Sequence, residues 1–196
     1  MARDRAARPE ARPVRLFVAT DVPEDVRRRL ADATRPWHDR VEGARWVTPE
    51  NWHVTMKFLG SVYPRLLSWV TDQVRAAASS GEPFTSALTE LGAFPSARRA
   101  RVLWAGLEDP QGRYALLAST LDGLLEREFD PEKRAFTPHL TVARFKVQGP
   151  LPEELLATDV RSHPFPVEHL TLYRSYLQRP AARYEPLERF ALGGRR

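Results

Sequence analysis

Cysteine is absent from this chain of 196 residues, which excludes disulfides, thiolate metal sites and cysteine nucleophiles. No apolar run approaches the ~20 residues of a membrane-spanning helix. The first residues also lack the apolar core of a secretory signal. We therefore expect a cytoplasmic protein with no membrane partner. Hydrophobic residues make up 42% and charged residues 28%, which is typical of a globular domain.

Lysine is scarce as well, because only Lys57, Lys133 and Lys146 are found among 30 basic residues. The net charge of +5 and the pI of about 9.9 are compatible with a polyanionic partner such as RNA. They are equally compatible with a genome that favours arginine. Composition alone does not choose between these two explanations.

The order of elements predicts an α+β fold with largely antiparallel sheets. Hydrophobic alternation and β-branched residues predict strands at 14–20, 44–48, 52–60, 84–94, 101–107, 139–147, 169–177 and 184–192. Helical spacing predicts helices from a cap at Asp21 to about Pro36, over 64–79 and over 112–129. The segment 150–164 is bounded by prolines. We expect one domain over 14–192 between disordered tails at 1–13 and 193–196. A strand–helix–strand–strand unit ending at His53 has a loose echo that ends at His139.

Three of the five histidines lie in the pattern His-x-Thr-apolar, at positions 53–56, 139–142 and 169–172. On a strand, the histidine and the threonine of this pattern point to the same face, while the apolar residues point to the other. Each motif therefore offers an imidazole and a hydroxyl side by side. A single motif of this kind is usually no more than a polar sheet face, so the count by itself identifies no site.

Two such motifs that face each other form an acid–base couple, because an imidazole gives or takes a proton near neutral pH. The two threonine hydroxyls can donate hydrogen bonds to an anion between them, and a phosphodiester fits this arrangement. We expect no metal, since no second carboxylate or imidazole shares the face beside His53 or His139 and zinc needs three or four ligands.

The chain resembles the 2H phosphoesterases, and within them the bacterial and archaeal RNA 2′,3′-cyclic phosphodiesterases formerly called 2′-5′ RNA ligases. The segments that carry the resemblance are RLFVAT (15–20), RWVTPENWHVTMKFLG (45–60), GAFPSARRARVLWAGL (92–107), RAFTPHLTVARFK (134–146), LTLYRSYL and YEPLERFAL. The resemblance implies two antiparallel-sheet lobes in pseudo-two-fold relation, with helices outside and the active site in the cleft between the lobes.

The resemblance also implies roles for individual residues. His53 becomes the proton donor to the leaving 3′ oxygen, and His139 becomes the proton acceptor from water. Thr55 and Thr141 hold the phosphate, and the product is a 2′-phosphomonoester. No cofactor is implied. The third motif, at His169, is not part of the family pattern, and we interpret it as a coincidence on a structural strand.

Two basic residues are further candidates for substrate binding. Lys57 shares strand parity with His53 and Thr55, whereas Arg144 breaks parity with His139 and reaches a phosphate only if the strand bends. A solvated surface role is the alternative for both. Phe58 and Trp46 could stack on a base, but core packing is the favoured role. We expect His38 and His163 at the surface.

The leading hypothesis is a metal-independent cyclic phosphodiesterase, monomeric, that acts on RNA ends such as those of tRNA fragments and can run in reverse as a 2′-5′ ligase. A non-catalytic RNA- or phosphate-binding protein is one alternative. A phosphodiesterase that acts on a small cyclic nucleotide is the other.

Overall fold

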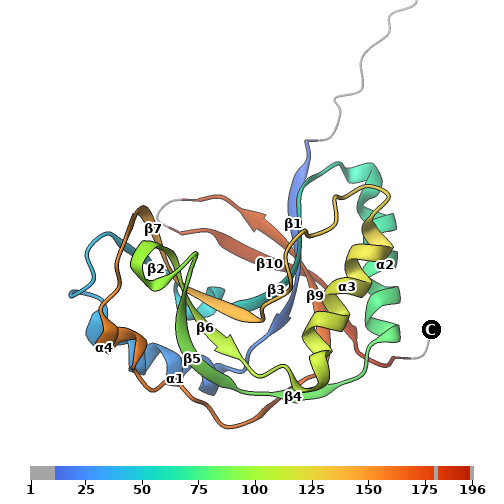
Figure 1. Cartoon of the computed structure of the whole chain (residues 1–196). Helices are drawn as coiled ribbons and strands as arrows, with labels where there is room; N and C mark the ends of the chain where they lie inside the picture. Colours follow the sequence, from blue (N-terminus) through green and yellow to red (C-terminus); the bar gives the residue numbers. More distant parts are fainter. Residues whose placement is uncertain (1–11, 179–180, 195–196) are drawn as a thin grey trace, which may run out of the picture.

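The computed structural model of the protein describes residues 12–178 and 181–194 (Figure 1). Residues 1–11 and 195–196 of the two expected tails lie outside it, while Gly193 donates a backbone hydrogen bond to Ala78. The strands are β1 (Val14–Asp21), β2 (Ala44–Trp46), β3 (His53–Val62), β4 (Phe84–Ser86), β5 (Leu88–Phe94), β6 (Ala100–Leu107), β7 (His139–Gly149), β8 (Phe165–Val167), β9 (His169–Tyr176) and β10 (Arg183–Ala191). The α-helices are α1 (Glu24–Thr34), α2 (Leu67–Ser80), α3 (Arg113–Leu125) and α4 (Glu153–Leu156).

The main sheet consists of two antiparallel halves, as expected for an α+β fold. One half has the order β10-β9-β1-β3 and is called lobe 1 here; the other contains β7, β6 and β5, with β2 on the edge of β7 opposite β6, and is called lobe 2. Within the described residues, β3 and β7 are joined by a single pair, Val54 with Leu140. The sheet is therefore continuous, but it is divided into two lobes at one point.

Helices cover one face of each lobe. α2 contacts β9 and β10 and lies beside α3, which contacts β3, so this pair covers lobe 1 (Figure 1). α4 contacts β5 of lobe 2, and the short 3₁₀ turn Arg35–Trp37 after α1 is tied to the end of α4 by a 3.0 Å hydrogen bond from Trp37 Nε1 to Thr158 Oγ1. None of the helices in the described residues is long and apolar enough to span a membrane.

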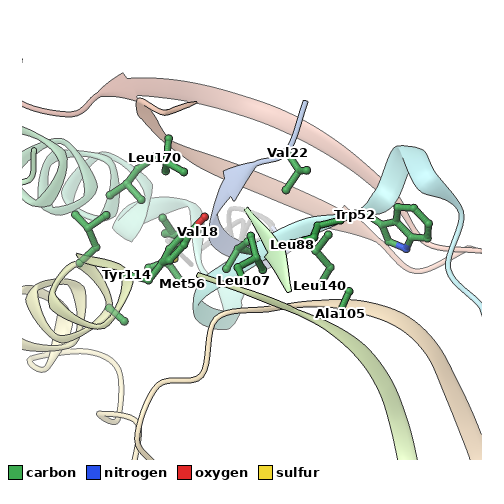
Figure 2. Close-up of a cluster of buried hydrophobic side chains, with 14 of the residues drawn as sticks. Val18, Val22, Trp52, Met56, Leu88, Ala105, Leu107, Tyr114, Leu140 and Leu170 are labelled. Atoms are coloured by element: carbon green, nitrogen blue, oxygen red, sulfur yellow. The ribbon is translucent and has the colours of Figure 1, made fainter. Parts of the chain in front are cut away.

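One hydrophobic core runs under both lobes. Figure 2 shows members of it from lobe 1 and from lobe 2, namely Val18, Met56, Leu170, Ala105, Leu107 and Leu140. Because side chains alternate along a strand, the residues between these positions point to the opposite face of the sheet. That opposite face carries His53, Thr55, His139 and Thr141, and we call it the histidine face.

Two β-bulges lie at the same place in the two lobes. Against β1, Thr55 pairs with Ala19 and Lys57 with Val18, so that Met56 is an extra residue in β3. Against β6, Thr141 pairs with Trp104 and Ala143 with Leu103, so that Val142 is an extra residue in β7. In each motif the bulge falls on the residue directly after the threonine. Two successive side chains then point into the core, and the parity of the strand reverses beyond them.

Most of the expected elements are present, with three differences. The expected strand 84–94 is two strands, because β4 leaves the main sheet and pairs with β8, a strand that the sequence analysis missed. The segment 150–164 contains α4. The internal echo is strand–helix–strand, β1-α1-β3 and β6-α3-β7, since the short β2 has no counterpart between α3 and β7.

Candidate active site

The Val54–Leu140 pair brings the two His-x-Thr motifs together. Each histidine precedes the paired residue of its strand and each threonine follows it. In antiparallel strands, the residue before one member of a pair lies across from the residue after the other. His53 is therefore directed across from Thr141, and Thr55 across from His139. The two imidazoles occupy opposite corners of a square on the histidine face.

Both imidazoles are fixed by the same backbone bond. His53 Nδ1 lies 2.8 Å from the carbonyl oxygen of Asn51, and His139 Nδ1 lies 2.7 Å from that of Thr137. A carbonyl only accepts, so Nδ1 carries the proton in both rings. Each neutral ring then has its lone pair on Nε2. Once protonated, each ring donates from that same atom, so either histidine can serve as base or acid through Nε2.

Aromatic rings surround His53. Phe17 stacks on it with ring centroids 4.7 Å apart, and Tyr184 meets it edge-on at 5.2 Å. Tyr173 lies 6.1 Å from His53 and also stacks on Phe17 at 5.1 Å. This apolar burial is the main cause that lowers the pKa of His53 from 6.5 to about 4. His139 has fewer aromatic neighbours, and Phe94 meets it edge-on with ring centroids 5.1 Å apart. The pKa of His139 is also lowered, chiefly by burial.

Asp21 places a negative charge beside His53. It is the last residue of β1, its Cα pairs with that of His53, and its carboxylate raises the pKa of the imidazole against the effect of burial. Thr171 Oγ1 donates to Asp21 Oδ2 at 3.0 Å, and the Tyr173 hydroxyl donates to Oδ1. The prediction that Asp21 caps α1 is wrong, because that helix begins after Pro23 without a side-chain cap.

Arg144 reaches the site because of the bulge at Val142. Val142 and Ala143 both point into the core, so Arg144 emerges on the histidine face, which meets the condition set from the sequence. Its Nη2 donates to Thr141 Oγ1 at 3.4 Å. The guanidinium charge lowers the pKa of both His53 and His139. An anion between the motifs would therefore meet a cation as well as the hydroxyls.

Lys57 is directed away from the site, and the prediction from strand parity is wrong. The bulge at Met56 turns Lys57 into the interior, where its side chain is 6% exposed. There the ammonium group forms an ion pair with Asp122 of α3 and donates to the carbonyl oxygen of Asp130 at 2.6 Å. Lys57 thus ties β3 to the helix and loop that precede the second motif.

The same bulge places Phe58 on the histidine face. Its side chain is 58% exposed and its ring lies 5.8 Å from Phe17, so the favoured core role does not hold for this residue. Trp46 is half-buried against the core and stacks on His38 at 4.3 Å. His163 forms an exposed contact with Asp25 at 3.0 Å.

The third motif supplies a hydroxyl to another group. Thr171 is fully buried and donates to Asp21, and His169 pairs with Ala191 at the far end of the lobe. Sequence reasoning missed Phe17, Asp21, Tyr173 and Tyr184. Alternation in β1 is the signal that could have found two of them, because Phe17, Ala19 and Asp21 share one face. Within residues 12–178 and 181–194, no three histidine or carboxylate side chains gather as a set of metal ligands.

The chain is similar to known phosphoesterases over most of its length. The family model described as LigT like phosphoesterase matches residues 21–104 and 106–184. An RNA 2′,3′-cyclic phosphodiesterase of Methanothermobacter thermautotrophicus is 33% identical, covering 91% of this chain and 99% of the relative. One from Geobacillus stearothermophilus is 28% identical, but the chain spans only 57% of its length. The crystal structure of Escherichia coli LigT with 3′-AMP superposes with a TM-score of 0.75 at 28% identity, over 92% of this chain and 98% of LigT.

Burial of His53 predicts a specific loss of stability in acid. Because its pKa is lowered in the folded protein, the unfolded chain binds more protons between about pH 6.5 and 4, and the free energy of unfolding falls as the pH falls through this range. Between about pH 7.5 and 4.5, we expect the free energy of unfolding of His53→Gln to fall by about 2 kcal/mol less than that of the parent. Urea unfolding at both pH values measures this difference. Equal losses in the parent and the variant would contradict the buried, neutral imidazole.

The ion pair of Lys57 predicts a structural role. Lys57→Met leaves Asp122 desolvated without its cation, and we expect a loss of about 3 kcal/mol in the free energy of unfolding. The control Lys57→Met/Asp122→Asn removes both charges but keeps the Asp122 side-chain oxygen for the amide of Glu132, and should recover part of that loss. Affinity for inorganic phosphate should not change in either variant. A stable Lys57→Met that binds phosphate weakly would instead place Lys57 in the site.

Proposed function

The chain belongs to the LigT-like phosphoesterase family, and from this membership and the site we propose that it hydrolyses 2′,3′-cyclic phosphodiesters at RNA ends. The observation that carries the proposal is the pair of His-x-Thr motifs set across from each other by the Val54–Leu140 pair, each with a free Nε2. The similar protein of E. coli has been crystallised with 3′-AMP, a nucleotide with a phosphate at the ribose end. Both motifs come from one chain, so one copy of the domain 14–192 contains the whole site.

The cyclic phosphate binds between the two motifs. The hydroxyls of Thr55 and Thr141 donate to its non-bridging oxygens. Thr141 Oγ1 accepts from Arg144, which leaves its own proton free for the phosphate and brings a positive charge close to it. These groups stabilise the charge that builds on the phosphate oxygens in the transition state.

The proton transfers follow from the unequal charges around the two rings. Burial and Arg144 both favour neutral His139, which suits it to take a proton from water. Burial and Arg144 lower the pKa of His53 to about 4 in the free protein, and Asp21 opposes them. The phosphate anion of a bound substrate adds to the effect of Asp21, so we assign the donated proton to His53. Water then attacks phosphorus, His139 Nε2 accepts its proton, the bond to the 3′ oxygen breaks, and His53 Nε2 protonates that oxygen. The product is a 2′-phosphomonoester with a free 3′ hydroxyl.

The same arrangement supports 2′-5′ ligation. If the 5′ hydroxyl of a second RNA takes the place of water, His139 accepts its proton and the new linkage joins the 2′ oxygen to the 5′ end. No step uses a metal or a covalent intermediate, because the chain supplies both protons and the hydrogen bonds to phosphate.

The histidine roles predict a bell-shaped pH dependence of kcat/KM with its maximum on the acid side of neutrality. The rate falls in acid as His139 becomes protonated and falls in base as His53 loses its proton, and the pKa of each ring is lowered in the free protein. His53→Ala and His139→Ala should each reduce kcat by about 10²–10⁴, and the double variant should be little worse. Assays use a short RNA ending in a 2′,3′-cyclic phosphate, with the product phosphate located by NMR.

Two outcomes of this assay would contradict the mechanism. A predominantly 3′-phosphate product would show that the two histidines act on the ring in the opposite sense. Binding of the RNA without turnover by the parent protein would favour the non-catalytic alternative.

Metal independence is tested by chelation. After exhaustive dialysis against EDTA, we expect kcat to stay within about twofold of the untreated protein. Two histidines and two threonines offer too few ligands to hold a metal ion, and the two imidazoles carry out both proton transfers by themselves. Loss of turnover that zinc or manganese restores would require a different mechanism.

A further inference from the structure

Three cations lie close together on the histidine face of lobe 2, beyond the two His-x-Thr motifs. Arg45 of β2 pairs directly with Arg144 of β7, and Lys146 follows two residues along the same strand. Their common face is set by their neighbours: Ala44, Trp46 and Phe145 pack against the core on the other side. All three cationic side chains are exposed. We call them the basic row.

The basic row has no partner of opposite charge within residues 12–178 and 181–194. No salt bridge among the described residues involves Arg45, Arg144 or Lys146, although many other arginines of the chain are paired with carboxylates. Like charges placed directly across from each other in antiparallel strands destabilise the sheet. Here Arg45 and Arg144 repel each other in that position. A bound polyanion would relieve this repulsion.

The row has a direction, and it is confined to one lobe. It begins at Arg144, which bonds Thr141, and continues along β7 and β2 away from the Val54–Leu140 junction. β2 pairs with β7 on the edge opposite β6, beyond the point where β3 leaves it. The place in lobe 1 that corresponds to Arg144 holds Phe58, which carries no charge. Related positions of the two lobes therefore differ in charge, although the backbone pattern is repeated.

We propose that the basic row binds the ribose-phosphate chain of single-stranded RNA on the 5′ side of the terminal nucleotide. The proposal rests on the proposed function, because it takes the cyclic phosphate to lie between the motifs. From there the next phosphates reach Arg144, Arg45 and Lys146 in turn. Arg144 and Lys146 are alternate residues of one strand, about 6.6 Å apart, and Arg45 lies across from Arg144 on the next strand, so the three cations form an extended array suited to a chain and not to one phosphate. It makes the protein prefer RNA over a mononucleotide.

The test compares a 12-nucleotide RNA ending in a 2′,3′-cyclic phosphate with cytidine 2′,3′-cyclic monophosphate. In the variant Arg45→Gln/Lys146→Gln, kcat/KM for the 12-mer should fall on the order of tenfold at low salt, and the slope of its logarithm against that of salt concentration should decrease by about 1.4, since each contact to a single strand contributes about 0.7. The mononucleotide should react as with the parent. The control Arg65→Gln/Arg127→Gln removes the same charge from positions on the helix-covered side and should behave as the parent.

Three other outcomes would overturn the role of the basic row, and one of them would also overturn the proposed function. A variant that reacts with the 12-mer as fast as the parent, while the parent hydrolyses both substrates, overturns the basic row and leaves the proposed function intact. An equal loss in the control variant assigns the effect to net charge and also overturns the row. A parent protein that hydrolyses neither substrate overturns the proposed function, and the row with it.

Discussion

The single pair between Val54 and Leu140 is the contact on which the site depends. It joins two half-sheets that are otherwise separate, and it fixes the register of β3 against β7. A slip of one residue between the two strands would turn one of the two motifs into the core, because side chains alternate. The continuous core below the pair holds both lobes and so resists such a slip. Catalytic geometry here is a consequence of strand register and not of loop conformation.

Much of this architecture could be predicted from the sequence. The strands, the three longer helices and the shared face of each histidine and threonine follow from hydrophobic alternation and helical spacing. The bulges do not, and they decide the rest of the site. In β7 the doublet Val142-Ala143 is apolar and hints at two inward side chains. In β3 the doublet Met56-Lys57 hides the same geometry, because a lysine normally marks an exposed position. Its partner Asp122 is distant in sequence, so no local pattern reveals the buried ion pair.

The two lobes present similar backbone geometry with different electrostatics. Each histidine bonds the carbonyl two residues before it, so both rings offer Nε2. Symmetry of this kind leaves the acid and base roles undecided. In the proposed mechanism the roles are assigned from neighbours that are not symmetric: Asp21 acts on His53, whereas Arg144 lowers the pKa of both rings. The first favours a bound proton and the second disfavours one. The proposed mechanism thus gives two copies of one motif opposite roles without any change in the motif itself.

The third motif shows what turns a tetrapeptide into a site. His169 and Thr171 have the same spacing and strand parity as the other two pairs, yet no strand in the described part of the chain presents a matching motif to them across a register pair. Thr171 donates its hydroxyl hydrogen bond to Asp21 and is fully buried, so it cannot donate to a phosphate as well. Thr171 affects the site indirectly, because it holds the Asp21 carboxylate that lies beside His53. The chemistry of a His-x-Thr strand is therefore determined by the strand that it meets.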